Sequence, residues 1–74
     1  MGTKTIADLK KGENGIIVGF KDESLSVKLL EMGCLPGSEV ILRHIAPFGD
    51  PIAIKISGYI LSMRKIEAAN IEIV

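Results

Sequence analysis

The chain has 74 residues, nine basic and nine acidic, so its formal net charge is zero. That length allows one domain with one core. The balanced charge argues against a dedicated nucleic-acid binder, which usually carries a basic excess to neutralise phosphate. Hydrophobic residues make up 47% of the chain but aromatic residues only 4%, which predicts a core built from Ile, Leu and Val.

The single cysteine, Cys34, leaves no internal disulfide and is typical of a reducing compartment. The apolar runs are too short to cross a bilayer, and the N-terminus lacks the apolar core of a signal peptide. We therefore expect a cytoplasmic domain over residues 1–74, without direct membrane insertion. Residues 1–4 are expected to form a loose N-terminus.

A helical turn and a strand are predicted first along the chain. Residues 5–9 favour one helical turn, because Thr5 is an N-cap type of residue and Asp8 lies three positions further on. The Ile- and Val-rich run at 15–20 predicts a strand.

The next element is a helix that begins near residue 23 and ends at about Met32. Its N-cap is either Asp22 or Ser24. Gly33 supplies the left-handed conformation that commonly ends a helix. Apolar residues at helical spacing indicate the face toward the core; they are Leu25, Leu29 and Met32.

Apolar and polar residues then alternate with period two, which predicts four further strands. These strands are expected at 38–45, 52–57, 59–64 and 71–73. Ser57 and Gly58 fit a two-residue hairpin turn, and a tight turn is expected before the last strand. The residues predicted to be buried are Val18, Leu29, Val40, Leu42, Ile54, Leu61 and Ile73, with His44 on the same face as Val40.

Together these elements predict a mainly β fold, a small five-stranded barrel with one helix inserted after the first strand. The helix is expected to cover one open end or side of the barrel. From the residues alone, such a module is expected to act by interaction.

Three blocks of sequence resemble the ferrous iron transport protein A family: LLEMGCLPG at 29–37, APFGDPI at 46–52 and GYILSMRKIEA at 58–68. The resemblance covers about residues 4–74. It implies an SH3-like barrel that serves as a cytosolic accessory protein of a membrane ferrous-iron transporter with its own GTPase domain. A similar fold forms the C-terminal domain of iron-dependent repressors, so a metal-responsive regulatory domain that binds a transition metal itself is the alternative.

A metal site is weakly indicated by Cys34 and His44, since thiolate and imidazole bind transition metals. Ten residues separate them, and the short spacings of specific metal motifs are absent. The simpler interpretation is that Cys34 is a small buried hydrophobe and His44 a strand residue near the rim. We expect no required cofactor, and weak transition-metal binding stays open.

The loop at 46–51 is the best candidate for a binding surface, because prolines stiffen it on both sides of an aromatic residue and an acid. Phe48 is costly to expose unless it packs on the barrel or on a partner. Asp50 either meets a basic group on a partner or accepts hydrogen bonds from its own turn.

Arg43 and Arg64 are the only arginines. Either could act on the GTPase of the transporter as an arginine finger, but a solvated arginine or an ion pair with Glu67 or Glu72 is the simpler interpretation. The chain lacks a phosphate-binding loop and a catalytic constellation, so we expect no enzyme activity.

The hypothesis for the partner surface combines three features. They are Phe48, Tyr59 and the edge of the helix around Leu30, with Asp50, Arg43 and Arg64 as further candidates. The expected partner is the transporter, and a homo-oligomer through the same surface is an alternative; no nucleic acid is expected.

Overall fold

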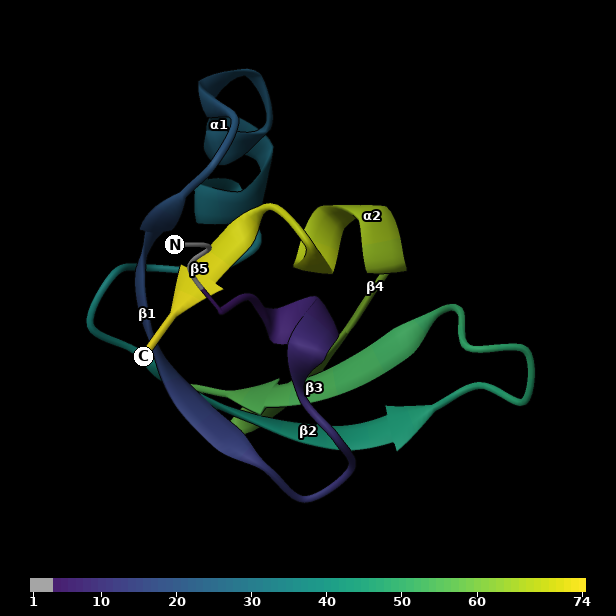
Figure 1. Cartoon of the computed structure of the whole chain (residues 1–74). Helices are drawn as coiled ribbons and strands as arrows, with labels where there is room; N and C mark the ends of the chain where they lie inside the picture. The colour runs from purple at the N-terminus through teal and green to yellow at the C-terminus, as the bar shows by residue number, and fades with distance from the viewer. Residues whose placement is uncertain (1–3) are drawn as a thin grey trace.

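Five short antiparallel strands form one sheet in the order β4-β3-β2-β1-β5 (Figure 1). The computed structural model describes residues 4–74. In chain order the elements are η1 (Ile6–Asp8), β1 (Asn14–Phe20), α1 (Glu23–Glu31), β2 (Glu39–Ile45), β3 (Ile52–Ile56), β4 (Tyr59–Met63), α2 (Lys65–Ala68) and β5 (Ile71–Ile73). The predicted mainly β fold, with one helix inserted after the first strand, is confirmed. Although the sheet curls strongly, its two edge strands β4 and β5 are not paired with each other.

The N-terminal residues that the structure describes are held to the last strand. The Ile73 N–H donates to the Lys4 carbonyl at 2.8 Å, and Thr5 forms a bridge with Glu72. The rest of the loose segment expected at 1–4 falls on residues 1–3, which lie outside the described residues.

Both predicted helix starts use an acidic side chain. The Asp8 carboxylate accepts the Thr5 N–H at 2.9 Å, as the spacing of these two residues predicted. At α1 the choice between Asp22 and Ser24 is settled, because the Asp22 carboxylate accepts the Ser24 N–H at 2.9 Å. The Thr5 hydrogen bonds hold the pKa of Asp8 below its ordinary value, and those of Ser24 do the same for Asp22.

The hairpin between β3 and β4 is the predicted two-residue turn. Ser57 and Gly58 both have positive φ, 50° and 83°. Such a pair is the requirement of a type I′ turn, whose twist matches that of the flanking strands. The turn sets the register in which Ile54 lies opposite Leu61.

The core is aliphatic, as the composition predicted. Its largest fully buried side chains include Ile6, Ile17, Leu29, Leu42, Ile54, Ile56, Ile71 and Ile73. Leu61 is only partly buried against this cluster. The prediction for Val18 is wrong, because Val18 is 49% exposed and its neighbour Ile17 is buried.

A bulge explains why the period-two alternation fails in β2, whereas β1 alternates regularly through Val18 in the opposite phase to the prediction. The pairing of β1 with β5 shifts between Ile17 and Gly19, and the pairing of β2 with β3 shifts between Leu42 and His44. An extra residue at a bulge reverses which side chains face the core. His44 is therefore exposed, although Val40 and Leu42 on the same strand are buried.

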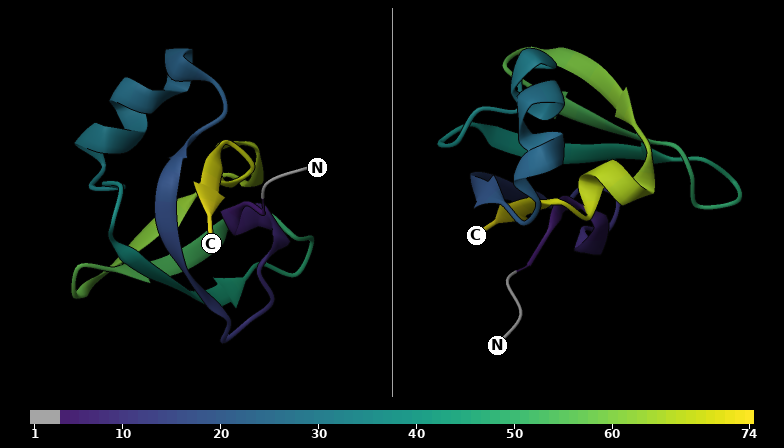
Figure 2. Two further views of the ribbon diagram at one scale, coloured as in Figure 1. Left: turned by 60° about the vertical axis from the view of Figure 1, so that its left-hand side comes forward. Right: turned by 90° about the horizontal axis from the view of Figure 1, so that it is seen from above.

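Helix α1 lies across the opening between the two edge strands, with β4 on one side and β5 on the other (Figure 2). Leu29 of α1 is fully buried in the core beneath it. On the β5 side, the buried Asn70 accepts the Asp22 N–H at 2.6 Å and donates to the Asp22 carbonyl at 3.2 Å. Towards α2, Lys28 forms an ion pair with Glu67 at 2.8 Å.

We predict that Asn70→Ala lowers the free energy of unfolding by about 1–3 kcal/mol, because it removes the partners of both Asp22 backbone groups. Urea denaturation measures this change. Asn14→Ala is the matched control: it removes a hydrogen bond between exposed side chains, to Glu39, and should cost less than about 0.5 kcal/mol. Equal losses in the two variants would contradict the prediction.

We also predict that Glu67 makes stability depend on pH in the acid range. The hydrogen bonds from Lys28 and from the Arg64 N–H hold the pKa of Glu67 below its ordinary value of 4.5. Because the pKa of Glu67 is lower in the folded than in the unfolded chain, its carboxylate stabilises the fold at pH values above the unfolded-state pKa. This contribution to the free energy of unfolding is lost as pH falls through the folded-state pKa.

The difference in unfolding free energy between the wild type and Glu67→Gln should therefore shrink as pH falls below about 4.5. Urea unfolding at a series of pH values between neutral and strongly acidic measures it. A wild type and a Glu67→Gln variant with parallel profiles would show that the prediction is wrong.

Candidate partner-binding surface

The loop at 46–51 joins β2 to β3 and is braced by three hydrogen bonds. The Gly49 N–H donates to the Ala46 carbonyl at 2.7 Å, and the Ala46 N–H donates to the Pro51 carbonyl at 3.1 Å. The Asp50 carboxylate accepts the Lys65 N–H at 2.9 Å, which ties the loop to the start of α2. The Asp50–Pro51 peptide bond is cis. The three hydrogen bonds make the loop a fixed frame for its side chains.

Phe48 stands on this frame with its side chain 100% exposed. Of the two explanations considered for an aromatic residue at this position, packing on the barrel is therefore wrong. Exposing a whole aromatic ring to water forgoes the largest apolar burial that a side chain can provide. Contact between Phe48 and a partner stays a prediction.

Asp50 has a structural role in this chain. Its carboxylate does not cap its own turn, as the alternative supposed, but accepts a backbone N–H of Lys65, fifteen residues away. Asp50 also lines a shallow depression together with Pro51 and Arg64. The residue as a whole is exposed.

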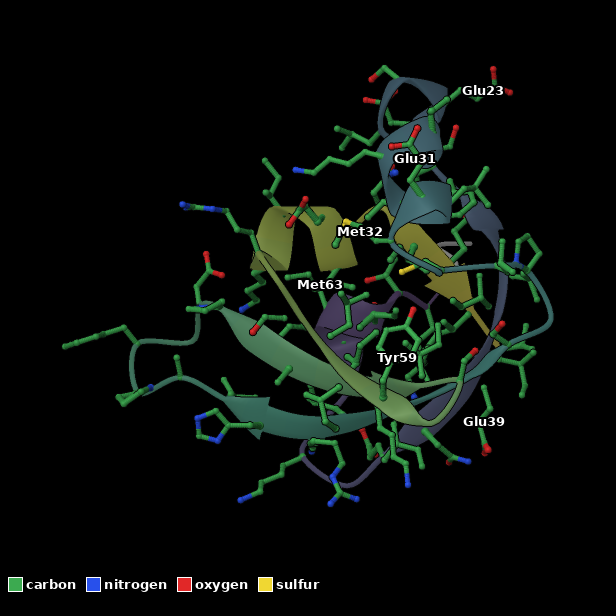
Figure 3. All side chains as sticks on the ribbon, turned by 180° about the vertical axis from the view of Figure 1, so that it is seen from behind. Glu23, Glu31, Met32, Glu39, Tyr59 and Met63 are labelled. Carbon is green, nitrogen blue, oxygen red and sulfur yellow. The ribbon has the colours of Figure 1, made fainter. Side chains whose placement is uncertain are left out.

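Tyr59 holds α1 to the sheet. Its hydroxyl donates to the Met32 carbonyl at 2.8 Å, and Figure 3 shows the side chain reaching from β4 toward the end of α1. Gly33, next to Met32, has φ 102°, and a Cβ there would collide with the Tyr59 hydroxyl. Tyr59 is 43% exposed, so part of the ring is accessible although its hydroxyl is engaged.

The residues of the predicted surface fall into two areas. Phe48 follows the end of β2 that pairs with Ile52, whereas Tyr59 lies beside Ile56 at the opposite end of β3. From Ile52 to Ile56 the strand advances by four residue steps of about 3.2–3.4 Å each, so its two ends are about 13 Å apart. Phe48, Asp50 and Arg64 form one area, which we call the loop surface.

The second area lies around the end of α1 and contains Tyr59 with the helix edge. Leu30 and Val27 are exposed there. Lys28, on the other side of the helix, is engaged by Glu67. Phe48 and Tyr59 therefore lie at opposite ends of β3, and each area is tested separately.

Both arginines are exposed, as a solvated role requires. Arg43 lies on β2 beside Lys11 and Gly12, outside both areas. The Glu67 carboxylate, one of the expected ion-pair partners of an arginine, accepts the Arg64 N–H at 2.8 Å and binds the Lys28 side chain instead.

Cys34 and His44 are in different environments. Cys34 is fully buried, and burial together with the nearby charge of Glu67 raises the pKa of its thiol to about 11. A metal ligand must be the thiolate, which this environment disfavours. His44 is exposed on β2. Within residues 4–74, His, Cys, Asp and Glu side chains do not gather in a group of three that could hold a metal ion.

The described helices are all too short or too polar to cross a membrane. Sequence reasoning missed two contacts of the surface, Asp50 with Lys65 and Tyr59 with Met32. Each joins residues fifteen or more positions apart, and no local signal in the sequence indicates either of them.

Comparison with known proteins gives relatives along the whole described chain. The model of the FeoA domain family matches residues 4–74. The Fe(2+) transport protein A/Fe(2+) transporter FeoB fusion protein of Porphyromonas gingivalis is 32% identical over 69 residues; these are 92% of this chain but only 8% of the fusion protein.

Solved structures agree with this relationship. A FeoA-like protein from Clostridium acetobutylicum superposes with a TM-score of 0.89 at 30% identity, covering 100% of this chain and 88% of the other. FeoA of Stenotrophomonas maltophilia, an SH3 domain protein complexed with zinc, gives 0.82 at 20% identity over 96% and 89% of the two chains, which shows the shared SH3-like fold. The family match over 4–74 shows that the chain belongs to the FeoA domain family.

Proposed function

We propose that this FeoA domain is a cytoplasmic accessory module of a membrane ferrous-iron transporter and acts by contact with the transporter. The fusion protein of Porphyromonas gingivalis supports this proposal, because it carries the FeoA and FeoB parts in one polypeptide. Two parts encoded as one chain stay at high effective concentration, which favours direct contact between them.

The observation that carries the proposal is the loop surface. Phe48 is fully exposed on a loop whose backbone is fixed by hydrogen bonds to Ala46, Pro51 and Lys65. A rigid aromatic anchor loses little conformational entropy on binding, and aromatic residues dominate interface energetics. Asp50 and Arg64 beside it add charges of both signs that can select a partner.

The proposed role is not catalytic. Cys34 is buried with its thiol pKa raised to about 11, so it is a poor nucleophile. His44 stands alone on an exposed strand, and the glycines at 12–19 do not have the spacing of a phosphate-binding loop. The family resemblance implies that the transporter has its own GTPase domain, and we assign phosphoryl transfer to that domain.

A metal-responsive role has less support from the described residues. Its two candidate ligands are a buried thiol and an exposed imidazole, and a site needs at least three converging donors. The zinc complex of the Stenotrophomonas maltophilia protein bears on the fold alone at 20% identity.

Pull-down of the FeoB transporter of the same organism by immobilised wild-type and variant chains tests the proposal. Phe48→Ala should weaken binding by about tenfold or more, equivalent to about 1.4 kcal/mol. Its thermal stability should be unchanged, because the side chain is 100% exposed. Ile60→Ala, which truncates an apolar side chain that is 57% exposed on β4, is the matched control and should bind normally.

Leu30→Ala reports on the second area in the same assay. If Leu30→Ala weakens binding and Phe48→Ala does not, the transporter binds the helix edge. The proposal that it binds the loop surface would then be wrong. A wild-type chain that does not capture the transporter at all would contradict the accessory role itself.

A further inference from the structure

The two edges of the sheet differ, because the chain itself covers one of them. Along β5, the Ile73 N–H donates to the Lys4 carbonyl at 2.8 Å, and Thr5 forms a bridge with Glu72. The first described residues therefore occupy that edge. β4 is the other edge strand (Figure 3), and among residues 4–74 only β3 pairs with it. The outer edge of β4 is thus open.

The register of the hairpin shows which main-chain groups lie on this open edge. Ile56 and Tyr59 flank the two-residue turn and lie opposite each other, and such residues exchange hydrogen bonds in a hairpin of this kind. Hydrogen-bonded and non-hydrogen-bonded pairs then alternate along the ladder. The N–H and C=O groups of Ile60 and Ser62 therefore point away from β3. No main-chain hydrogen bond to another element of the described chain uses these four groups, and both residues are exposed.

β4 also lacks the features with which soluble proteins usually protect a sheet edge. Its sequence, YILSM, contains no charged residue and no proline. Its pairing with β3 runs from Tyr59 to Met63 without a bulge, unlike the pairings of β1 with β5 and of β2 with β3. Charged side chains, prolines and bulges are the usual devices against the addition of a further strand. Neither the hydrogen bonding nor the sequence of β4 therefore opposes an incoming strand.

The open edge leads into the loop surface. Arg64 of that surface directly follows Met63, and Met63 lies opposite Ile52, the first residue of β3 after the loop. The other end of β4 is held to α1 by the Tyr59 hydroxyl. A segment that lies along residues 60–62 therefore reaches the loop surface at one of its ends.

We propose that an extended segment of the transporter adds to the sheet along β4 as a further strand. Free N–H and C=O groups at alternate residues are complementary to an extended main chain, and strand addition to a sheet edge uses this complementarity. An antiparallel segment would exchange two hydrogen bonds with Ile60 and two with Ser62. The inference rests on the proposed accessory role and extends the contact from the loop surface to the sheet edge.

Two changes at one position test whether the main chain of β4 is recognised. Ile60→Pro removes the outward N–H but no hydrogen bond to β3, and proline is tolerated at such positions of edge strands. It should weaken capture of the transporter in the pull-down by about tenfold or more. Ile60→Ala keeps the N–H and is the matched control, which should bind as the wild type. If circular dichroism shows that Ile60→Pro is unfolded, Ser62→Pro with Ser62→Ala replaces the pair.

Hydrogen–deuterium exchange tests the same contact without any substitution. In the complex of the wild type with the detergent-solubilised transporter, the amide hydrogens of Ile60 and Ser62 should exchange at least about tenfold more slowly than in the free chain. The amides of Leu61 and Met63 point toward β3, so their exchange should change little and they serve as internal controls.

The outcomes separate this inference from the accessory role. Capture of the transporter without slower exchange at Ile60 and Ser62 overturns the strand addition and leaves the accessory role standing. A wild type that captures no transporter contradicts both. Slower exchange that arises in the chain alone and grows with its concentration would show a second copy on the edge, and would overturn the transporter as its occupant.

Discussion

The structure depends on holding α1 over the opening between β4 and β5. The two edge strands do not pair, and without a cover the core residues beneath Leu29 would meet water. Side chains from three elements hold the helix in place: Asn70 before β5 binds Asp22, Glu67 of α2 binds Lys28, and Tyr59 of β4 binds the Met32 carbonyl. In a 74-residue chain with little core to spare, these polar contacts fix the helix that buries Leu29.

Most of the fold could be predicted from local patterns. Which side chains of β1 and β2 face the core could not. The run 52–56 alternates strictly, and its isoleucines are buried as predicted. In β1, Ile16, Ile17 and Val18 are consecutive and equally apolar, so the sequence does not indicate which of them faces the core. The structure places Ile17 opposite Ile73 of β5, more than fifty residues away, and no local pattern could predict that choice.

The exposure of Phe48 could be predicted from the sequence, but the contacts of the other candidate residues could not. An aromatic residue between two prolines indicates a rigid, exposed position, and Phe48 is exposed. Tyr59 has similar chemistry, yet its hydroxyl is bound to the end of α1. The difference lies in what the fold brings near each ring. No described residue covers Phe48, whereas Gly33 leaves room for Tyr59 only because it has no Cβ.

The hydrogen bonds of the loop at 46–51 explain how an aromatic side chain stays in water. A ring that folded back onto its own chain would be buried without any cost in association entropy. The hydrogen bonds of Ala46, Gly49 and Asp50 instead hold the backbone in a conformation in which the Phe48 side chain is 100% exposed. The ring is thus presented to solvent on a backbone that is already ordered, which lowers the entropy that a contact through it would cost.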